Sequence, residues 1–137
     1  MAVVKDLITV ADDNTLSFGD YSLTAKAKKD NFQFEGDLYK IKTYKTITKL
    51  EKNGMMIYES VPGTAVHNFS AMDAVMAFQV EGPEDTQITL ELEPEKEYKV
   101  FVDDTNVGRM KTNLGGKLNI SIELNPEQIV TVKVVKL

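Results

Sequence analysis

Few side chains in this chain could catalyse a reaction or bind a transition metal. The chain contains one histidine, His67, one arginine, Arg109, no cysteine and no tryptophan. A transition-metal site needs two or three imidazole or thiolate ligands, and a nucleophilic serine or threonine needs a base beside it. His67 alone supplies neither arrangement, and its place between Val66 and Asn68 indicates a partnered histidine on a strand or turn. We therefore expect no metal site, no cofactor and no enzymatic activity.

Acidic side chains are abundant, and they leave two kinds of chemistry to consider. The chain has 21 Asp and Glu residues, and a pair of carboxylates can hydrolyse a glycosidic bond when the fold brings them together. Calcium binds carboxylate, amide and carbonyl oxygens, which Asp12-Asp13-Asn14 and Asp103-Asp104-Thr105-Asn106 contain. Such segments also form β-turns, in which the side chains bond to their own backbone. We interpret both segments as turns and assign no metal ligands.

Charge and hydropathy patterning argue against two classes of partner. The net charge is −5, whereas a protein that binds nucleic acid needs positive charge to displace the counterions of the phosphates. No stretch approaches the roughly 18 apolar residues of a membrane helix, and the N-terminus lacks the pattern of a secretory signal. We expect no nucleic-acid or membrane partner and a cytoplasmic location by default, with export by a non-classical route as the alternative.

Short segments of alternating apolar and polar residues predict β-strands along the chain. In Leu118–Leu124 every second side chain is apolar, which places the apolar set on one face of a strand. Asn53-Gly54 is typical of a two-residue hairpin turn. In the long segment Leu38–Leu50 the apolar side chains shift from one face of the expected strand to the other, so we expect a bulge near Thr43–Lys45. Leu23–Asn31 has no apolar stripe, and we expect a loop or a short helical turn there.

The number and spacing of these segments predict the fold class. About nine or ten strands at spacings of roughly 8–12 residues are typical of an all-β protein. We expect an antiparallel β-sandwich, immunoglobulin-like or jelly-roll, with barrel closure as the alternative. The length of 137 residues suits a single domain, 1–137. The final strands, from Tyr98 to the C-terminus, are expected to form a four-stranded meander or Greek key.

Two sets of residues are candidates for contact with a partner. The segment Met55-Met56-Ile57-Tyr58 has apolar side chains on both faces of the expected strand. Both faces must therefore be buried, either within the sandwich or against another subunit. With two methionines that follow, the candidate interface consists of Met55, Met56, Ile57, Tyr58, Met72 and Met76. Tyr44, at the expected bulge, is the tyrosine that we expect to be exposed, and it is the candidate platform for a sugar ring.

Charge is divided unevenly along the sequence. Lys26-Ala27-Lys28-Lys29 is the densest basic segment, and Glu91–Glu97 carries four acidic residues at alternate positions. On a strand, alternate positions share one face. An acidic face of this kind is either simply solvated or contacts the basic segment of a neighbouring copy.

Several segments resemble known bacterial proteins. Residues 97–108, EYKVFVDDTNVG, resemble the Tyr-x-Val-x-Val-Asp-x-x-x-x-Val-Gly hairpin of immunoglobulin-like modules. With residues 36–43, 58–64 and 111–118, nearly the whole chain is similar to short uncharacterised all-β bacterial proteins, some of which are labelled endosialidase. Sialidases hold the sialate carboxylate with an arginine cluster, whereas this chain has Arg109 alone. The resemblance therefore implies an assembly or accessory domain, and it assigns no site residues.

These observations lead to one main hypothesis and one alternative. The main hypothesis is a non-enzymatic β-sandwich that acts by self-association or by docking to another protein. The alternative is a small carbohydrate-binding module, or an accessory domain of a glycan-active system, which would use Tyr44.

Overall fold

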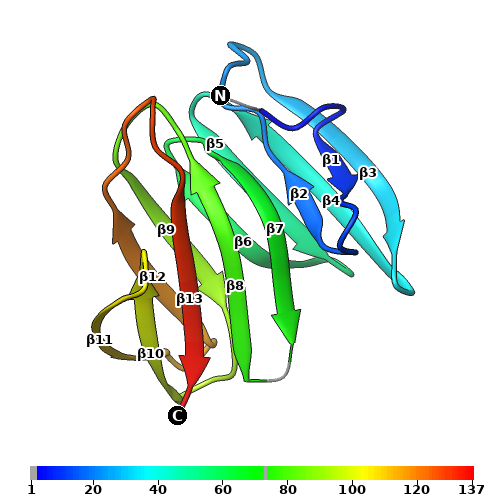
Figure 1. Ribbon diagram of the computed structural model, residues 1–137. Coiled ribbons are helices and arrows are strands. Elements are labelled where there is room, and N and C mark those ends of the chain that lie inside the picture. Colours follow the sequence, from blue (N-terminus) through cyan, green and yellow to red (C-terminus); the bar gives the residue numbers. More distant parts are fainter. Residues whose placement is uncertain (1–2, 73) are drawn as a thin grey trace.

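Two β-sheets face each other around one core in the computed structural model, which describes residues 3–72 and 74–137 (Figure 1). Residues 1, 2 and 73 of the expected domain lie outside the described part. The predicted all-β antiparallel sandwich is confirmed, with thirteen strands among the described residues rather than nine or ten. The strands are β1 (Ile8–Val10), β2 (Leu16–Phe18), β3 (Ala27–Phe34), β4 (Asp37–Tyr44), β5 (Ile47–Lys52), β6 (Met55–Val61), β7 (Ala65–Met72), β8 (Val75–Glu81), β9 (Thr86–Glu91), β10 (Glu97–Val102), β11 (Thr105–Lys111), β12 (Lys117–Ile122) and β13 (Val130–Lys136).

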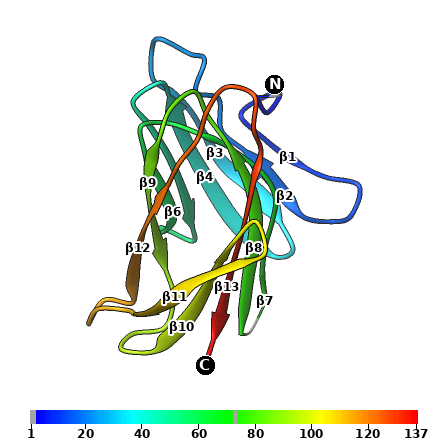
Figure 2. The same ribbon diagram turned by 60° about the vertical axis from the view of Figure 1, so that its left-hand side comes forward.

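The strands divide between a seven-stranded and a six-stranded sheet. The orders are β1-β2-β7-β8-β13-β10-β11 and β12-β9-β6-β5-β4-β3. The last four strands do not form a meander, because β12 crosses to the six-stranded sheet beside β9 and β13 returns between β8 and β10. Figure 2 shows this crossing from the side. The C-terminal strands therefore bind the two layers together.

An aromatic cluster fills the centre of the core. Tyr58 on β6 packs edge-on against Phe18 and Phe78 of the other sheet, with ring centroids 5.2 and 5.6 Å apart. Phe69 on β7 completes the cluster, 5.5 Å from Phe18. Edge-to-face pairs of this kind stabilise a core by about 1 kcal/mol each beyond the area that they bury. The cluster thus joins the two sheets at their middle.

The N-terminal half differs from the sequence prediction in two places. The segment Leu23–Asn31, expected as a loop or helical turn, contains most of β3, an edge strand that pairs with β4. The segment Leu38–Leu50 is not one bulged strand, because it turns at Lys45-Thr46 and pairs Tyr44 with Ile47. These two features add strands to those that the sequence predicted.

Candidate functional site

A cleft of about 760 Å³ opens between the two sheets at one end of the sandwich. The turns β1–β2 and β3–β4 contribute to it, as do the nearby ends of β5, β7 and β9 and the start of β8. Its floor is apolar and consists of Leu16, Tyr39, Phe69 and Met76, each at most 7% exposed. Its rim is mostly acidic and includes Asp13, Glu35, Asp37, Glu91 and the single basic residue Lys52. We call this feature the inter-sheet cleft.

Hydrogen bonds hold several side chains of the acidic rim in place. The Thr15 hydroxyl holds the pKa of Asp13 below its ordinary value, and the Asn53 amide does the same for Asp37. The Asn14 amide donates to Glu35 at 3.0 Å and links the β1–β2 turn to the β3–β4 turn. The lowered pKa values of Asp13 and Asp37 keep these two carboxylates ionised at neutral pH and make the mouth of the cleft electronegative.

The structure brings three of the six candidate interface residues to the inter-sheet cleft. Ile57 and Met76 line it from β6 and β8, and Met72 lines it from the end of β7. Met72 is 70% exposed, whereas Met76 is buried in the floor. Met55 is also exposed but is not part of the cleft lining, and Met56 beside it is half-buried. The predicted patch is therefore divided between the cleft and the β5–β6 turn.

Tyr58 belongs to the core and not to an interface. Its side chain is fully buried, and its hydroxyl lies 2.9 Å from Thr64 Oγ1. The Thr64 hydroxyl also lies 2.8 Å from Ser60 Oγ, and Thr48 Oγ1 donates to the Thr64 carbonyl at 2.8 Å. β6 is an inner strand of its sheet, and its core face, which carries Tyr58, is covered by Phe18 and Phe78 of the other sheet. The prediction that Tyr58 contacts a partner is wrong for this reason.

Tyr44, the candidate sugar platform, lies half-buried at the end of β4, while the cleft is at the Asp37 end of the same strand. The expected bulge is a hairpin turn. The other four tyrosines are buried, at 7% exposure or less. A sugar-stacking surface would therefore depend on Tyr44 alone among the tyrosines.

The one histidine is part of a polar cluster in the seven-stranded sheet. His67 Nε2 on β7 lies 3.0 Å from Glu81 Oε2 on β8, and Glu81 is 1% exposed. The Tyr21 hydroxyl donates to the other Glu81 oxygen at 3.5 Å. Burial and the Glu81 carboxylate raise the pKa of Tyr21 to about 12. The cluster holds the segment after β2 against the ends of β7 and β8.

No group of three or more His, Cys, Asp or Glu residues suited to a metal ion occurs within residues 3–72 and 74–137. The two Asx-rich segments serve as turns. Asp103 and Asp104 occupy the positive-φ positions of the β10–β11 hairpin, and the Asp103 side chain accepts from the Thr131 amide at 2.9 Å. Asp13 accepts from Thr15 in the β1–β2 turn.

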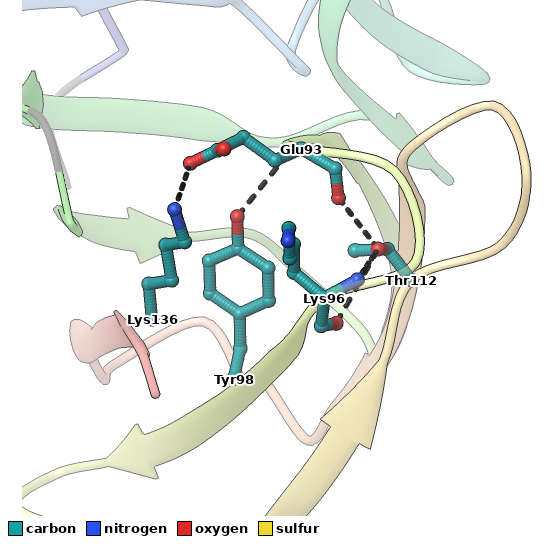
Figure 3. A network of polar contacts seen from close by, with 5 residues as sticks. All are labelled: Glu93, Lys96, Tyr98, Thr112 and Lys136. Carbon is teal, nitrogen blue, oxygen red and sulfur yellow. Dashed lines mark hydrogen bonds and ion pairs between the residues drawn. The ribbon is translucent and has the colours of Figure 1, made fainter.

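The acidic segment Glu91–Glu97 does not form one strand face, because β9 ends at Glu91 and a loop follows. Figure 3 shows how this loop is fixed. Glu93 pairs with Lys136 of β13 at 2.7 Å, and its backbone N–H donates to the Tyr98 hydroxyl at 3.1 Å. Thr112 joins the loop from the other side, since its hydroxyl donates to the Glu93 carbonyl and accepts from the Lys96 N–H. These contacts are internal and indicate a structural role.

Four strands form the edges of the two sheets, and three of them carry features that hinder pairing with another chain. β1 has only three residues. β3 carries two lysines and a bulge, with Asn31 at φ +57°. β11 has a bulge at Val107, followed by Gly108 at φ +131°. β12 differs from these, because it pairs with β9 in an uninterrupted register over all six residues.

The side chains of β12 alternate strictly between the core and the solvent. Leu118, Ile120 and Ile122 are at most 3% exposed, whereas Asn119 and Ser121 are exposed. The exposed pair is held in place by β9, since Thr89 donates to Asn119 and Gln87 donates to Ser121. β12 thus presents a regular outer edge at the margin of the sandwich (Figure 1), in which the backbone N–H and carbonyl of Lys117 already bond to Asn113. We call it the β12 edge.

In the described part of the chain there is no helix with the length and apolar character needed to cross a membrane. No family model, no curated protein and no solved structure matches this chain.

Proposed function

We propose that this protein is a non-enzymatic β-sandwich that associates with a second copy of itself through the β12 edge. One observation carries the proposal: of the four sheet edges in the described residues, β12 alone combines a regular register with the full length of a strand. Exposed edges of this type pair readily with a strand from another chain. In the proposed dimer the two six-stranded sheets join, edge to edge, into one.

The sequence of β12 is complementary to itself when two copies run antiparallel around a two-fold axis at Ile120. In that register Asn119 lies opposite Ser121 of the second copy, and Lys117 lies opposite Glu123, the residue that directly follows β12. Leu118 lies opposite Ile122, so apolar side chains continue the core and polar side chains continue the outer face. Each opposite-charge or apolar cross-strand pair contributes about 0.2–1 kcal/mol. The two-fold axis makes every pair except the central one occur twice.

A lysine placed on the β12 edge tests the proposal. In the dimer, the side chain of Ser121→Lys would be diagonal to Lys117 of the second copy, and like charges at this distance oppose pairing. We expect wild-type protein to dimerise as its concentration rises, and this variant to dimerise at least about tenfold more weakly. Gln87→Lys is the matched control, because Gln87 is Ser121's neighbour on β9, so both variants lose the same hydrogen bond and gain the same charge.

A charge exchange tests the register itself. Lys117→Glu and Glu123→Lys each place like charges opposite one another, whereas the double variant restores opposite charges. Sedimentation velocity should therefore show weaker dimers for each single variant and recovery for the double variant. A wild-type protein that remains monomeric at every concentration would contradict the proposal, as would equal dimerisation of Ser121→Lys and Gln87→Lys.

A further inference from the structure

The inter-sheet cleft has the composition of a binding site and is separate from the β12 edge. Beside its buried floor, the half-buried Phe34 and Ile57 and the exposed Met72 offer apolar surface to a ligand. Phe34 and Tyr39 lie with ring centroids 6.2 Å apart along one wall. Clefts with an apolar lining and a few polar groups at the rim are the usual form of binding sites.

The charge of the rim determines which ligand chemistry fits. Asp13, Glu35, Asp37 and Glu91 line the cleft. Two lysines offset part of their charge: Lys52 Nζ lies 3.5 Å from Asp37, and Lys117 Nζ lies 3.8 Å from Glu91. The mouth therefore has a surplus of negative charge around an apolar interior. Lysine and arginine side chains suit this arrangement, because their aliphatic stems pack on apolar surface while the charged groups remain at the rim.

The size of the cleft favours a short segment over a folded domain. A volume of about 760 Å³ accommodates a few side chains. The exposed methionine on one side also suits a peptide, since methionine adapts its shape to different apolar side chains. We propose that the inter-sheet cleft binds an extended segment of another protein in which basic and apolar side chains alternate.

The probe is a fluorescent synthetic peptide of alternating lysine and leucine residues, with binding followed by anisotropy. Two comparison peptides separate the contributions: one alternates glutamate and leucine, and the other alternates lysine and serine. We expect the lysine–leucine peptide to bind best, and its affinity to fall as salt screens the rim. Equal binding of the lysine–serine peptide would reduce the interaction to a general attraction between a polycation and an acidic protein, and it would overturn the proposal.

Two pairs of variants locate the binding site. Met72→Lys adds a positive charge to the cleft and should weaken binding by about tenfold or more. Met55→Lys is its control, because Met55 is similarly exposed, at 60% against 70%, but is not part of the cleft lining. Glu35→Gln removes a rim charge but keeps an oxygen that can accept from Asn14, and we expect a loss of about threefold. Glu84→Gln, at the opposite end of the sandwich, should have no effect.

Methionine methyl NMR gives an independent measurement on the unmodified protein. The methyl signals of Met72 and Met76 should shift when the lysine–leucine peptide is added, while that of Met55 should not. Failure of this peptide to bind, equal effects of Met72→Lys and Met55→Lys, or methyl shifts confined to Met55 would each overturn the proposal.

Discussion

Replacing Tyr58 by phenylalanine tests whether this side chain stabilises the core or serves an interface. The substitution keeps the ring and its edge-on contacts with Phe18 and Phe78, but it removes the hydroxyl that lies 2.9 Å from Thr64 Oγ1. The Thr64 hydroxyl keeps Ser60 as a partner, so the loss is close to that of one net hydrogen bond. We expect the free energy of unfolding to fall by about 1 kcal/mol.

Urea unfolding measures this loss as a lower midpoint at an unchanged slope. In a thermal scan the same loss corresponds to a decrease in Tm of roughly 3–5 °C. Tyr44→Phe is the control, because Tyr44 is half-buried at the end of β4, and we expect its effect to stay within about 0.5 kcal/mol. If Tyr58→Phe were as stable as wild type, the buried hydrogen bond would be refuted. If it changed the dimerisation constant, the assignment of Tyr58 to the core alone would be refuted.

Two further predictions concern the β5–β6 turn and the alkaline limit of stability. Gly54 has φ +84°, so Gly54→Ala should cost about 1 kcal/mol in a urea titration, whereas Gly115→Ala should have little effect because its backbone is not in the left-handed region. Burial raises the pKa of Tyr21 from 10.0 to about 12, so the unfolded chain loses this proton first and stability falls as the pH rises from about 10 through 12. Tyr21→Phe should reduce this loss, and a stability curve above pH 10 that is identical to that of wild type would contradict the buried environment.

The regular strands and hairpin turns could be predicted where each satisfies a local rule. The alternation in Leu118–Leu124 predicted β12, which buries Leu118, Ile120 and Ile122. The Asn53-Gly54 signal predicted the β5–β6 turn, where both residues have positive φ. In these segments a single local pattern determines the structure, so one sequence is enough to find it.

The features that were missed depend on contacts between distant segments. β3 is an edge strand with exposed lysines, so it does not need the apolar alternation of an inner strand. The Lys45-Thr46 turn contains no glycine, asparagine or proline. It is fixed instead by two backbone hydrogen bonds, from Lys45 N to the Leu23 carbonyl and from Gly63 N to the Lys45 carbonyl. Neither feature has a local signal.

The inter-sheet cleft could not be predicted for the same reason. Its lining comes from eight strands or their turns, and the sequence showed only two of its parts, the Asx-rich β1–β2 turn and the methionines of β7 and β8. Met72 and Met76 were grouped with Met55 by their apolar character. The structure separates them, because Met55 lies outside the cleft lining, beside Lys52 at the β5–β6 turn, whereas Met72 and Met76 both line the cleft.

The two proposed surfaces are separate in the fold but share one contact, and this determines which variants can distinguish them. Glu91 lines the inter-sheet cleft, and its Oε1 lies 3.8 Å from Lys117 Nζ on the β12 edge. Lys117→Glu therefore changes the charge at both surfaces. Ser121→Lys alters the edge at a residue outside the cleft lining, and Met72→Lys alters the cleft at a residue outside β12. Because each of these two variants acts on one surface only, loss of dimerisation and loss of peptide binding can be assigned to the β12 edge and the cleft separately.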